Sequence, residues 1–255
     1  MRPMTGMTQV KFRARFAETP EDLACAQALR YRRFRAGRAP GADHGAAARD
    51  CDAFDALARH VLVEDLRSGD LVCCFRALLL ADGSAISRSY SAQFYDLSRL
   101  AGFKAPMLEL GRFCIAEAAR DPDVLRVAWG FICGMVEAHG DEMMFGCSSF
   151  HGTETAAHED AFALLKENHL APRRWLPRVK APSVFRYARK LRLKKPDLAA
   201  AMRGMPPLLR TYLLMGGWVS DHAVVDRELD TLHVFTGVET RRVPAARRRM
   251  LRPAV

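Results

Sequence analysis

The sequence lacks the segments that would insert it into a membrane or direct its export. No uninterrupted apolar run approaches the ~18 residues of a membrane span, and the first residues lack the apolar stretch of a signal peptide. It has 7 cysteines, an odd number, and no two of them are spaced C-x-x-C. Because this pattern indicates reduced, mostly buried thiols, we expect a cytoplasmic protein.

Several signature motifs of enzymes and binding proteins are also missing. The sequence has no G-x-x-x-x-G-K-[ST] phosphate loop, no dinucleotide-binding G-x-G-x-x-G and no H-E-x-x-H metal motif. Residues 146–150 resemble a nucleophile elbow but lack its closing glycine. No signature of a nucleic-acid-binding module occurs. We therefore expect no metal site, no bound cofactor and no nucleic-acid partner.

What the sequence does have is a strong positive charge. The net charge is +10 over 255 residues, with 49% hydrophobic and 27% charged residues, which is a globular composition. Such a charge suits an acidic protein or anionic lipid as partner, and a merely basic surface is the alternative. Cations interleaved with aromatic rings crowd residues 173–203, and the candidate contact surface is Arg173, Arg174, Arg178 and Lys180.

The most informative stretch is Met107–Ile115, which is short, apolar and β-favouring and so predicts a buried strand. Charged side chains are seldom buried unless paired, yet this stretch contains Glu109 and Arg112. Gly111 between them indicates a bulge or a close backbone approach. Two interpretations stand: an internal ion pair, or a carboxylate beside an opened strand ladder.

Four other charged residues occupy unusual places. Arg30 lies on the apolar face of a predicted helix together with Phe34, so it either reaches out to water or turns inward to meet an anion. Asp52 and Asp55 are three residues apart, a spacing that can cap a turn. Arg76 lies among apolar neighbours on a predicted strand.

The remaining pattern predicts alternating strands and helices, with a loop over residues 35–50 that is long enough to be a lid or a binding loop. Strands are predicted over residues 9–16, 60–65, 71–80, 107–115, 142–148, 219–225 and 232–238. Helices are predicted over residues 20–34, 93–100, 122–139, 153–169 and 206–218.

Taken together, Arg30-x-x-x-Phe34, Asp52-x-x-Asp55, Arg76 and Glu109-x-x-Arg112 resemble the acyl-homoserine-lactone synthases, which have the GNAT N-acyltransferase fold. Over roughly residues 10–240 the chain is more similar to a sister family, the ornithine N-alpha-acyltransferases that make lyso-ornithine lipid. This likeness rests on residues 28–32, 52–55, 60–65, 108–112, 145–153 and 206–219.

The resemblance implies an α/β (α+β) fold of the GNAT type. Its central, mixed and twisted sheet is expected to splay beside the 107–115 strand and to carry helices on both faces. One acyltransferase domain is expected over residues 1–240, followed by a basic tail over residues 241–255.

The resemblance also implies an enzyme that moves a (3-hydroxy)acyl group from acyl carrier protein to the α-amino group of an amino acid, ornithine above all. The donor would be carried on the phosphopantetheine of the carrier protein, since the Gly-x-Gly/Ala loop of CoA-using relatives is not evident before Val124. The implied catalytic residues are Glu109, Gly111 and Arg112. The implied substrate-binding residues are Arg30, Phe34, Asp52, Asp55, Arg76 and Ser148.

Three alternatives stay open at this point. They are an acyl-homoserine-lactone synthase, an acyltransferase for glutamine or another amino acid, and a non-catalytic basic module that binds a membrane or a carrier protein. The loop before Asp52 is shorter and richer in Ala and Gly than is usual in the family, so it leaves the amino acid open. A single-chain lipid product would suit a peripheral position on the inner membrane.

Overall fold

The computed structural model describes residues 10–36 and 48–243 of the chain. This part divides into two compact units. The first takes the described residues up to Arg76 together with Arg112–Met135, and the second takes Ala77–Gly111 and the described residues from Val136 onward. The expectation of one domain over residues 1–240 stays a prediction, and most of the expected tail lies outside the described residues.

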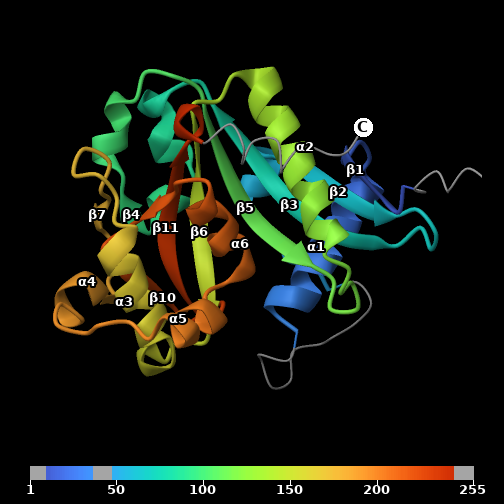
Figure 1. Ribbon diagram of the computed structural model, residues 1–255. Helices are drawn as coiled ribbons and strands as arrows, with labels where there is room; N and C mark the ends of the chain where they lie inside the picture. Colours follow the sequence, from blue (N-terminus) through green and yellow to red (C-terminus); the bar gives the residue numbers. More distant parts are fainter. Residues whose placement is uncertain (1–9, 37–47, 244–255) are drawn as a thin grey trace, which may run out of the picture. The chain divides into compact units, whose positions relative to one another are not determined.

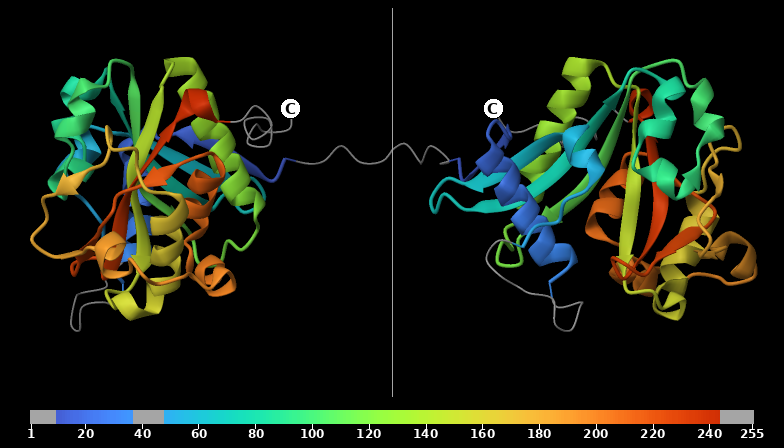
Figure 2. Two further views of the ribbon diagram at one scale, coloured as in Figure 1. Left: turned by 60° about the vertical axis from the view of Figure 1, so that its left-hand side comes forward. Right: turned by 180° about the vertical axis from the view of Figure 1, so that it is seen from behind.

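The first unit is a sheet with a helix on each face. Its strands follow the order β1, β2, β3, β5, and β1 pairs antiparallel with β2. The helices α1 and α2 lie on opposite faces of these strands, as the front and rear views agree (Figures 1 and 2). The bounds are β1 Phe12–Phe16, α1 Pro20–Phe34, β2 Arg59–Asp65, β3 Leu71–Leu80, β5 Met107–Ile115 and α2 Asp123–His139.

Local sequence explains where α1 begins. The Thr19 hydroxyl accepts a hydrogen bond from the backbone N–H of Asp22 at 3.1 Å, and Pro20 occupies the first helical position. The helix buries Ala26 and Leu29 against a core that includes Leu62 of β2. The helix predicted over residues 20–34 is therefore confirmed.

The second unit is built on strands in the order β3, β5, β6, β11, β10, β8, and β9 also pairs with β11. The pair β5–β6 is parallel, whereas β6–β11, β11–β10 and β10–β8 are antiparallel. The sheet is therefore mixed, and the predicted α/β class is confirmed. The bounds are β6 Met143–His151, β8 Val184–Phe185, β9 Trp218–Val219, β10 Ala223–Asp226 and β11 Thr231–Glu239, with a separate pair β4 Tyr95–Asp96 and β7 Arg178–Val179.

Four helices of the second unit pack around one apolar core. Phe162 and Leu165 of α3 meet Leu232 and Val234 of β11 there, and all four side chains are fully buried. The bounds are α3 Glu159–Asn168, α4 Tyr187–Lys190, α5 Leu198–Gly204 and α6 Pro207–Leu214. No helix among the described residues is long and apolar enough to cross a membrane.

Single-turn helices replace some of the predicted elements. The helix predicted over residues 93–100 is wrong, because the strand β4 occupies residues 95 and 96 and a short turn, η4, begins at Ser98, whose backbone N–H donates to the Asp96 side chain at 3.0 Å. The strand predicted over residues 219–225 is two strands, and the helix from 206 ends at Leu214. The 3₁₀ turns are η1 Ala53–Ala56, η2 Gly83–Arg88, η3 Ser91–Gln93, η4 Ser98–Gly102, η5 Thr155–His158 and η6 Thr240–Arg242.

Candidate active site

The first unit holds a cluster of opposite charges that α1, the segment before β2, β3 and the end of β5 contribute. The cluster contains every charged residue that the sequence analysis assigned to substrate binding, and Arg112 as well. Its members are Arg30, Arg35, Asp50, Asp52, Asp55, Arg76 and Arg112. We call it the ionic cluster.

Arg30 is the cation of this cluster that lies deepest. Its side chain is only 1% exposed, and its guanidinium lies 2.9 Å from Asp50 Oδ2 and 2.6 Å from Asp55 Oδ1. The interpretation in which Arg30 reaches water is therefore wrong, and the inward alternative is confirmed. A buried guanidinium needs such partners, because leaving it unpaired costs far more than the pair gains.

Arg76 and Arg112 complete the ionic cluster from neighbouring strands. The Nη1 atom of Arg76 donates to Asp52 and lies 3.1 Å from Asp55 Oδ1. Arg112 donates from Nε to Asp50 Oδ2 at 3.1 Å and from Nη2 to Asp52 Oδ2 at 3.2 Å. Each arginine thus joins two aspartates, which ties α1, the turn before β2 and both strands together.

Sequence reasoning missed two members of the cluster, Arg35 and, with more contacts, Asp50. Asp50 ends an unpatterned loop, so nothing but its charge beside Asp52 could have indicated its role. Its side chain is fully buried and meets Arg30, Arg35 and Arg112. Burial by itself would raise the pKa of Asp50, but these guanidinium groups outweigh it and the pKa is lowered.

Asp52 and Asp55 also cap the turn η1, so the predicted capping of a turn is confirmed. The backbone N–H of Phe54 donates to Asp52 Oδ1 at 2.9 Å, and that of Asp52 donates to Asp55 Oδ2 at 3.3 Å. Burial opposes the charge of Asp55, yet the hydrogen bond from Arg30 helps lower its pKa to about 2. Phe34, predicted beside these residues, packs on the apolar core that contains Leu29 instead.

Glu109 lies in the second unit and is 3% exposed. Its Oε2 atom accepts a hydrogen bond from the backbone N–H of Tyr90 at 2.8 Å. Its Oε1 atom accepts from the backbone N–H and the hydroxyl of Ser91, at 2.8 and 2.6 Å. Hydrogen bonds to a carboxylate favour its charged form, so these donors compensate the buried charge. Residues 82–106 have little sequence pattern, so the hydrogen bonds from residues 90 and 91 to Glu109 were not predicted.

Two further side chains of the second unit lie in the surroundings of Glu109. The Ser91 hydroxyl lies 3.5 Å from the sulfur of Cys147 on β6. Burial raises the pKa of the Tyr212 phenol on α6, and the charge of Glu109 raises it further. The carboxylate thus lies among a hydroxyl, a thiol and a neutral phenol.

The backbone beside Glu109 is irregular. The parallel ladder of β5 and β6 consists of four residue pairs, from Met107–Met143 to Leu110–Gly146. A Cβ atom on Gly146 would lie 2.3 Å from the Leu110 carbonyl oxygen, so only glycine fits there. Arg112 follows with a left-handed φ of 51°, which non-glycine residues rarely adopt. The irregularity expected at Gly111 therefore falls on Arg112, the next residue, and on Gly146, which pairs with Leu110.

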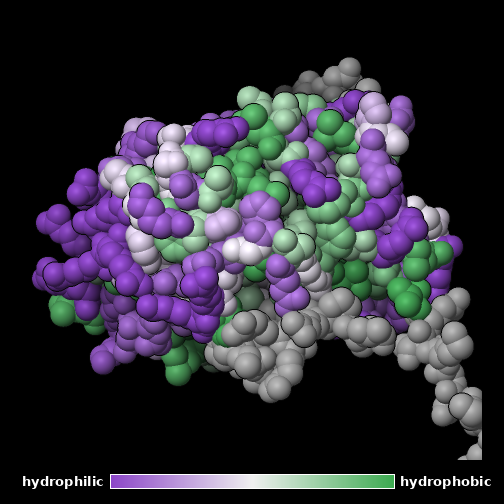
Figure 3. Space-filling model, turned by 90° about the horizontal axis from the view of Figure 1, so that it is seen from above, coloured by the Kyte–Doolittle hydropathy of each residue, from purple (hydrophilic) through white to green (hydrophobic). Residues whose placement is uncertain are grey.

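The other predicted site residues contact partners other than Glu109 and the ionic cluster. Ser148 on β6 is buried and accepts a hydrogen bond from the Thr236 hydroxyl at 2.9 Å. On the basic surface, Arg174 pairs with Glu239 at 3.2 Å. The remaining surface contacts are Arg178 to Asp96 at 4.0 Å and Lys180 Nζ to the Ala92 carbonyl at 2.6 Å. Hydrophilic side chains gather along the left flank in Figure 3, the side on which Figure 1 places β7 and α4.

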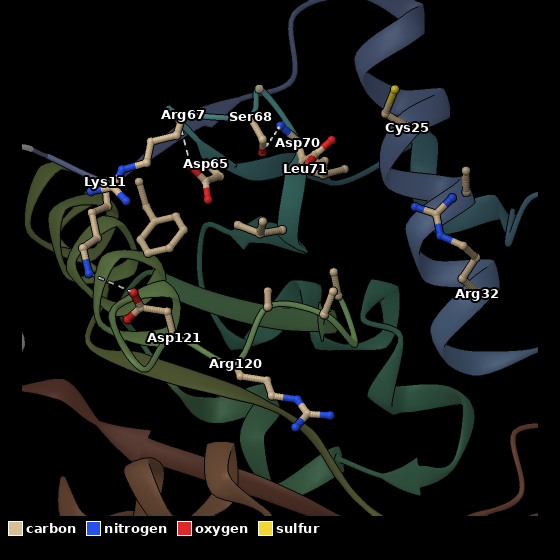
Figure 4. Close-up of a pocket in the computed structure, with 17 residues that line it drawn as sticks. Lys11, Cys25, Arg32, Asp65, Arg67, Ser68, Asp70, Leu71, Arg120 and Asp121 are labelled. Carbon is tan, nitrogen blue, oxygen red and sulfur yellow. Dashed lines mark hydrogen bonds and ion pairs between the residues drawn. The ribbon is translucent and has the colours of Figure 1, made fainter.

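A cavity of about 820 Å³ opens in the first unit, and its walls come from α1, β1, the turn between β2 and β3, and the segment after β5 (Figure 4). Lys11 and Asp121 pair across one end at 3.2 Å. The cavity shares no lining residue with the ionic cluster. In the part of the chain described, no three His, Cys, Asp or Glu side chains gather as metal ligands would.

Comparison with known proteins gives one consistent picture. Residues 29–130 match the model of an acetyltransferase (GNAT) domain. The chain is 32% identical to an L-ornithine N(alpha)-acyltransferase of Rhodobacter capsulatus, over 91% of either chain. It is 31% identical to another such enzyme, from Rhizobium meliloti, over 87% of this chain and 77% of that one.

The fold has a match among solved structures. FeeM, an N-acyl amino acid synthase from uncultured soil microbes, superposes with a TM-score of 0.51. The match covers 91% of this chain and 93% of that one at 9% sequence identity, so it concerns the fold alone.

Proposed function

Because the chain belongs to the family of the L-ornithine N(alpha)-acyltransferases, we propose that it transfers an acyl group to the α-amino group of ornithine. The product would be a single-chain, amide-linked lipid. The observation that carries this proposal is the buried carboxylate of Glu109 at the place where the β5–β6 ladder ends. An amine that attacks a thioester requires a base for its proton and donors for the oxyanion, and the end of this ladder offers a carboxylate with backbone beside it.

The proposed donor is a 3-hydroxyacyl thioester on the phosphopantetheine of acyl carrier protein. Two features support a carrier protein rather than free CoA. The segment before α2, residues 116–122, has no Gly-x-Gly/Ala motif to wrap a pyrophosphate, and the net charge of +10 suits an acidic partner.

The chemistry begins with a proton. An α-amino group has a pKa near 8 or above, so at neutral pH most of it is protonated and cannot attack. Glu109 takes that proton, directly or through one water molecule. The freed nitrogen attacks the thioester carbon, the C–N bond forms and the C–S bond breaks. The nitrogen then passes its second proton to the departing sulfur, which leaves as the pantetheine thiol, and Glu109 returns its proton to solvent. The three hydrogen bonds from residues 90 and 91 hold the carboxylate in place for this step.

The attack places negative charge on the carbonyl oxygen, which needs donors fixed in advance. Gly111 directly follows Leu110, the last residue of β5 that pairs with β6, and its backbone N–H is our candidate donor. The ionic cluster has a positioning role in this account. It holds Arg112, and with it the left-handed turn of the backbone, by two aspartates. We expect it to fix the end of β5 rather than to contact the substrate.

The experiment is a reaction of purified protein with 3-hydroxyacyl carrier protein and, in separate tubes, ornithine, glutamine or S-adenosylmethionine. We expect mass spectrometry to detect an amide with ornithine that the other two acceptors do not give. An amide with glutamine alone would mean that glutamine, and not ornithine, is the acyl acceptor. A lactone from S-adenosylmethionine would indicate an autoinducer synthase. No product in any tube would overturn the proposal in favour of a non-catalytic module.

A further inference from the structure

A short segment of the second unit exposes large apolar side chains to water. Leu193 is 83% exposed, Leu198 is 62% exposed and Met202 is 46% exposed. Leu198 and Met202 are four residues apart on α5, so they share one face of that helix. Burial of such side chains normally stabilises a fold, so three of them exposed within ten residues indicate a partner that covers them.

The turn that carries Leu193 is held firmly by the rest of the unit. The Lys166 ammonium of α3 donates to the carbonyl of Leu191 at 3.0 Å and to that of Lys194 at 2.9 Å. Leu191 itself is buried in the core. Leu193 is therefore presented by a fixed turn, and its exposure is not a by-product of a loose chain.

Positive charge surrounds the exposed leucine. A hollow of about 650 Å³ is lined by Leu193 and five cations against one acid, Glu159, and the cations are Arg186, Arg189, Lys190, Arg192 and Lys194. Glu159 pairs with Lys194 at 3.2 Å. Among the described residues, no acid pairs with Arg186, Arg189 or Arg192. The hollow can therefore take an anion from outside the chain.

We propose that residues 186–203, which comprise α4, the turn after it and α5, dock on the surface of an anionic phospholipid bilayer. Leu193, Leu198 and Met202 would enter the acyl-chain boundary, and the arginines beside them would contact headgroup phosphates. Figure 1 shows α4 and α5 along the lower edge of the unit. An acidic protein could pair with these cations. Exposed apolar side chains next to cations favour a lipid surface instead, because a bilayer offers both an apolar interior and anionic headgroups. The inference does not rest on the proposed acyl donor.

The test measures co-sedimentation of the full-length protein with vesicles of phosphatidylglycerol and phosphatidylcholine, and with vesicles of phosphatidylcholine alone. One variant combines Leu193→Ser with Leu198→Ser, and a second combines Arg189→Gln with Arg192→Gln. Matched controls are Leu57→Ser with Leu66→Ser, two leucines of the first unit that are 48% and 47% exposed. For the arginines the control is Arg67→Gln with Arg120→Gln, both on the rim of the other cavity.

We expect the wild-type protein and both controls to bind the anionic vesicles and not the zwitterionic ones. Each test variant should bind the anionic vesicles at least about fivefold more weakly, while far-UV circular dichroism and amide formation from soluble substrates stay unchanged. No binding by the wild type, or equal binding by variants and controls, would overturn the proposal. So would variants that bind vesicles normally but have a raised KM for acyl carrier protein, since the face would then be a carrier site.

Discussion

At the residue scale, the stability of the first unit depends on carboxylates that stay charged in a buried place. Asp50 and Asp55 each meet two or more guanidinium groups, and both have lowered pKa values although burial alone would raise them. The attraction of the arginines therefore exceeds the cost of removing the carboxylates from water. This balance holds only while the carboxylates are ionised, which makes acid the natural probe of the ionic cluster.

We predict that the free energy of unfolding decreases as the pH is lowered, because Asp55 becomes protonated. Its pKa is about 2 in the folded protein against a usual 3.8, so the unfolded chain takes up the proton first as the pH falls. The stabilisation is complete above about pH 4 and is lost between about pH 4 and pH 2. By this linkage the free energy of unfolding loses about 1 kcal/mol at pH 3 relative to pH 5. Urea unfolding at several pH values measures it.

The matched variant for this measurement is Asp55→Asn, which cannot titrate. It should be less stable at neutral pH and should lose less stability between pH 5 and pH 3 than the wild type does. If both proteins lose stability equally over that range, Asp55 does not carry the effect.

For Glu109→Gln we predict a fall in turnover of at least about tenfold per folded molecule, because removal of a general base typically costs ~10²–10⁴-fold. The amide of glutamine would also turn an N–H toward the donors of residues 90 and 91, so the melting temperature should fall as well. Ser91→Ala is the control, since it removes one of the three hydrogen bonds and keeps the carboxylate. Normal turnover of folded Glu109→Gln would show that the carboxylate only anchors residues 90 and 91.

At this scale the sequence pointed to most of the ionic cluster but not to the contacts of Glu109. Arg30 and Arg76 interrupt apolar faces of regular elements, and such interruptions are visible in a periodic pattern. Asp50 and Ser91 lie in stretches without a period, and their roles depend on contacts with residues that are distant in the chain. Such long-range partners cannot be inferred from local spacing.

At the scale of elements, the close approach of β5 and β6 decides the geometry of the candidate site. The predicted strand Met107–Ile115 is confirmed in its bounds, as is Leu71–Leu80, because apolar β-favouring runs bounded by turns are strong signals. The 3₁₀ turns between residues 83 and 102 were not predicted, since each is at most six residues long and only η2 has a side-chain cap at its start.

We predict that Gly146→Ala destabilises the second unit, because the new methyl group would lie 2.3 Å from the Leu110 carbonyl oxygen, which is backbone and cannot yield. A loss of about 2 kcal/mol in the free energy of unfolding is expected from such overpacking. Gly134→Ala is the control: it lies inside α2 and its methyl group would meet nothing within 4 Å. That variant should be neutral or more stable by up to about 1 kcal/mol. Equal urea midpoints for the two variants would contradict the close approach.

At the scale of the whole molecule, the net charge of +10 should speed encounter with an acidic carrier protein. Raising salt should therefore raise the KM for the carrier protein more than the KM for the amino acid, since screening acts over ~8 Å at physiological ionic strength. Arg173→Glu with Arg174→Glu should mimic this effect. Steady-state kinetics at two salt concentrations measure both.

The control for that double variant is the vesicle assay. Arg173 and Arg174 lie outside residues 186–203, so the charge reversal should change carrier kinetics and leave most vesicle binding intact. If it abolishes vesicle binding and leaves the carrier KM unchanged, the basic surface around β7 is a membrane contact and its assignment to the carrier protein is wrong.

The most direct test of the central claim is mass spectrometry of lipids from a host that makes no ornithine lipid and expresses this chain. The account predicts a new single-chain lipid whose fragments contain ornithine joined by an amide to a 3-hydroxyacyl group. Expression of Glu109→Gln should yield at least about tenfold less of it. A lactone in the culture extract with no new amino lipid, or no new lipid at all, would contradict the account.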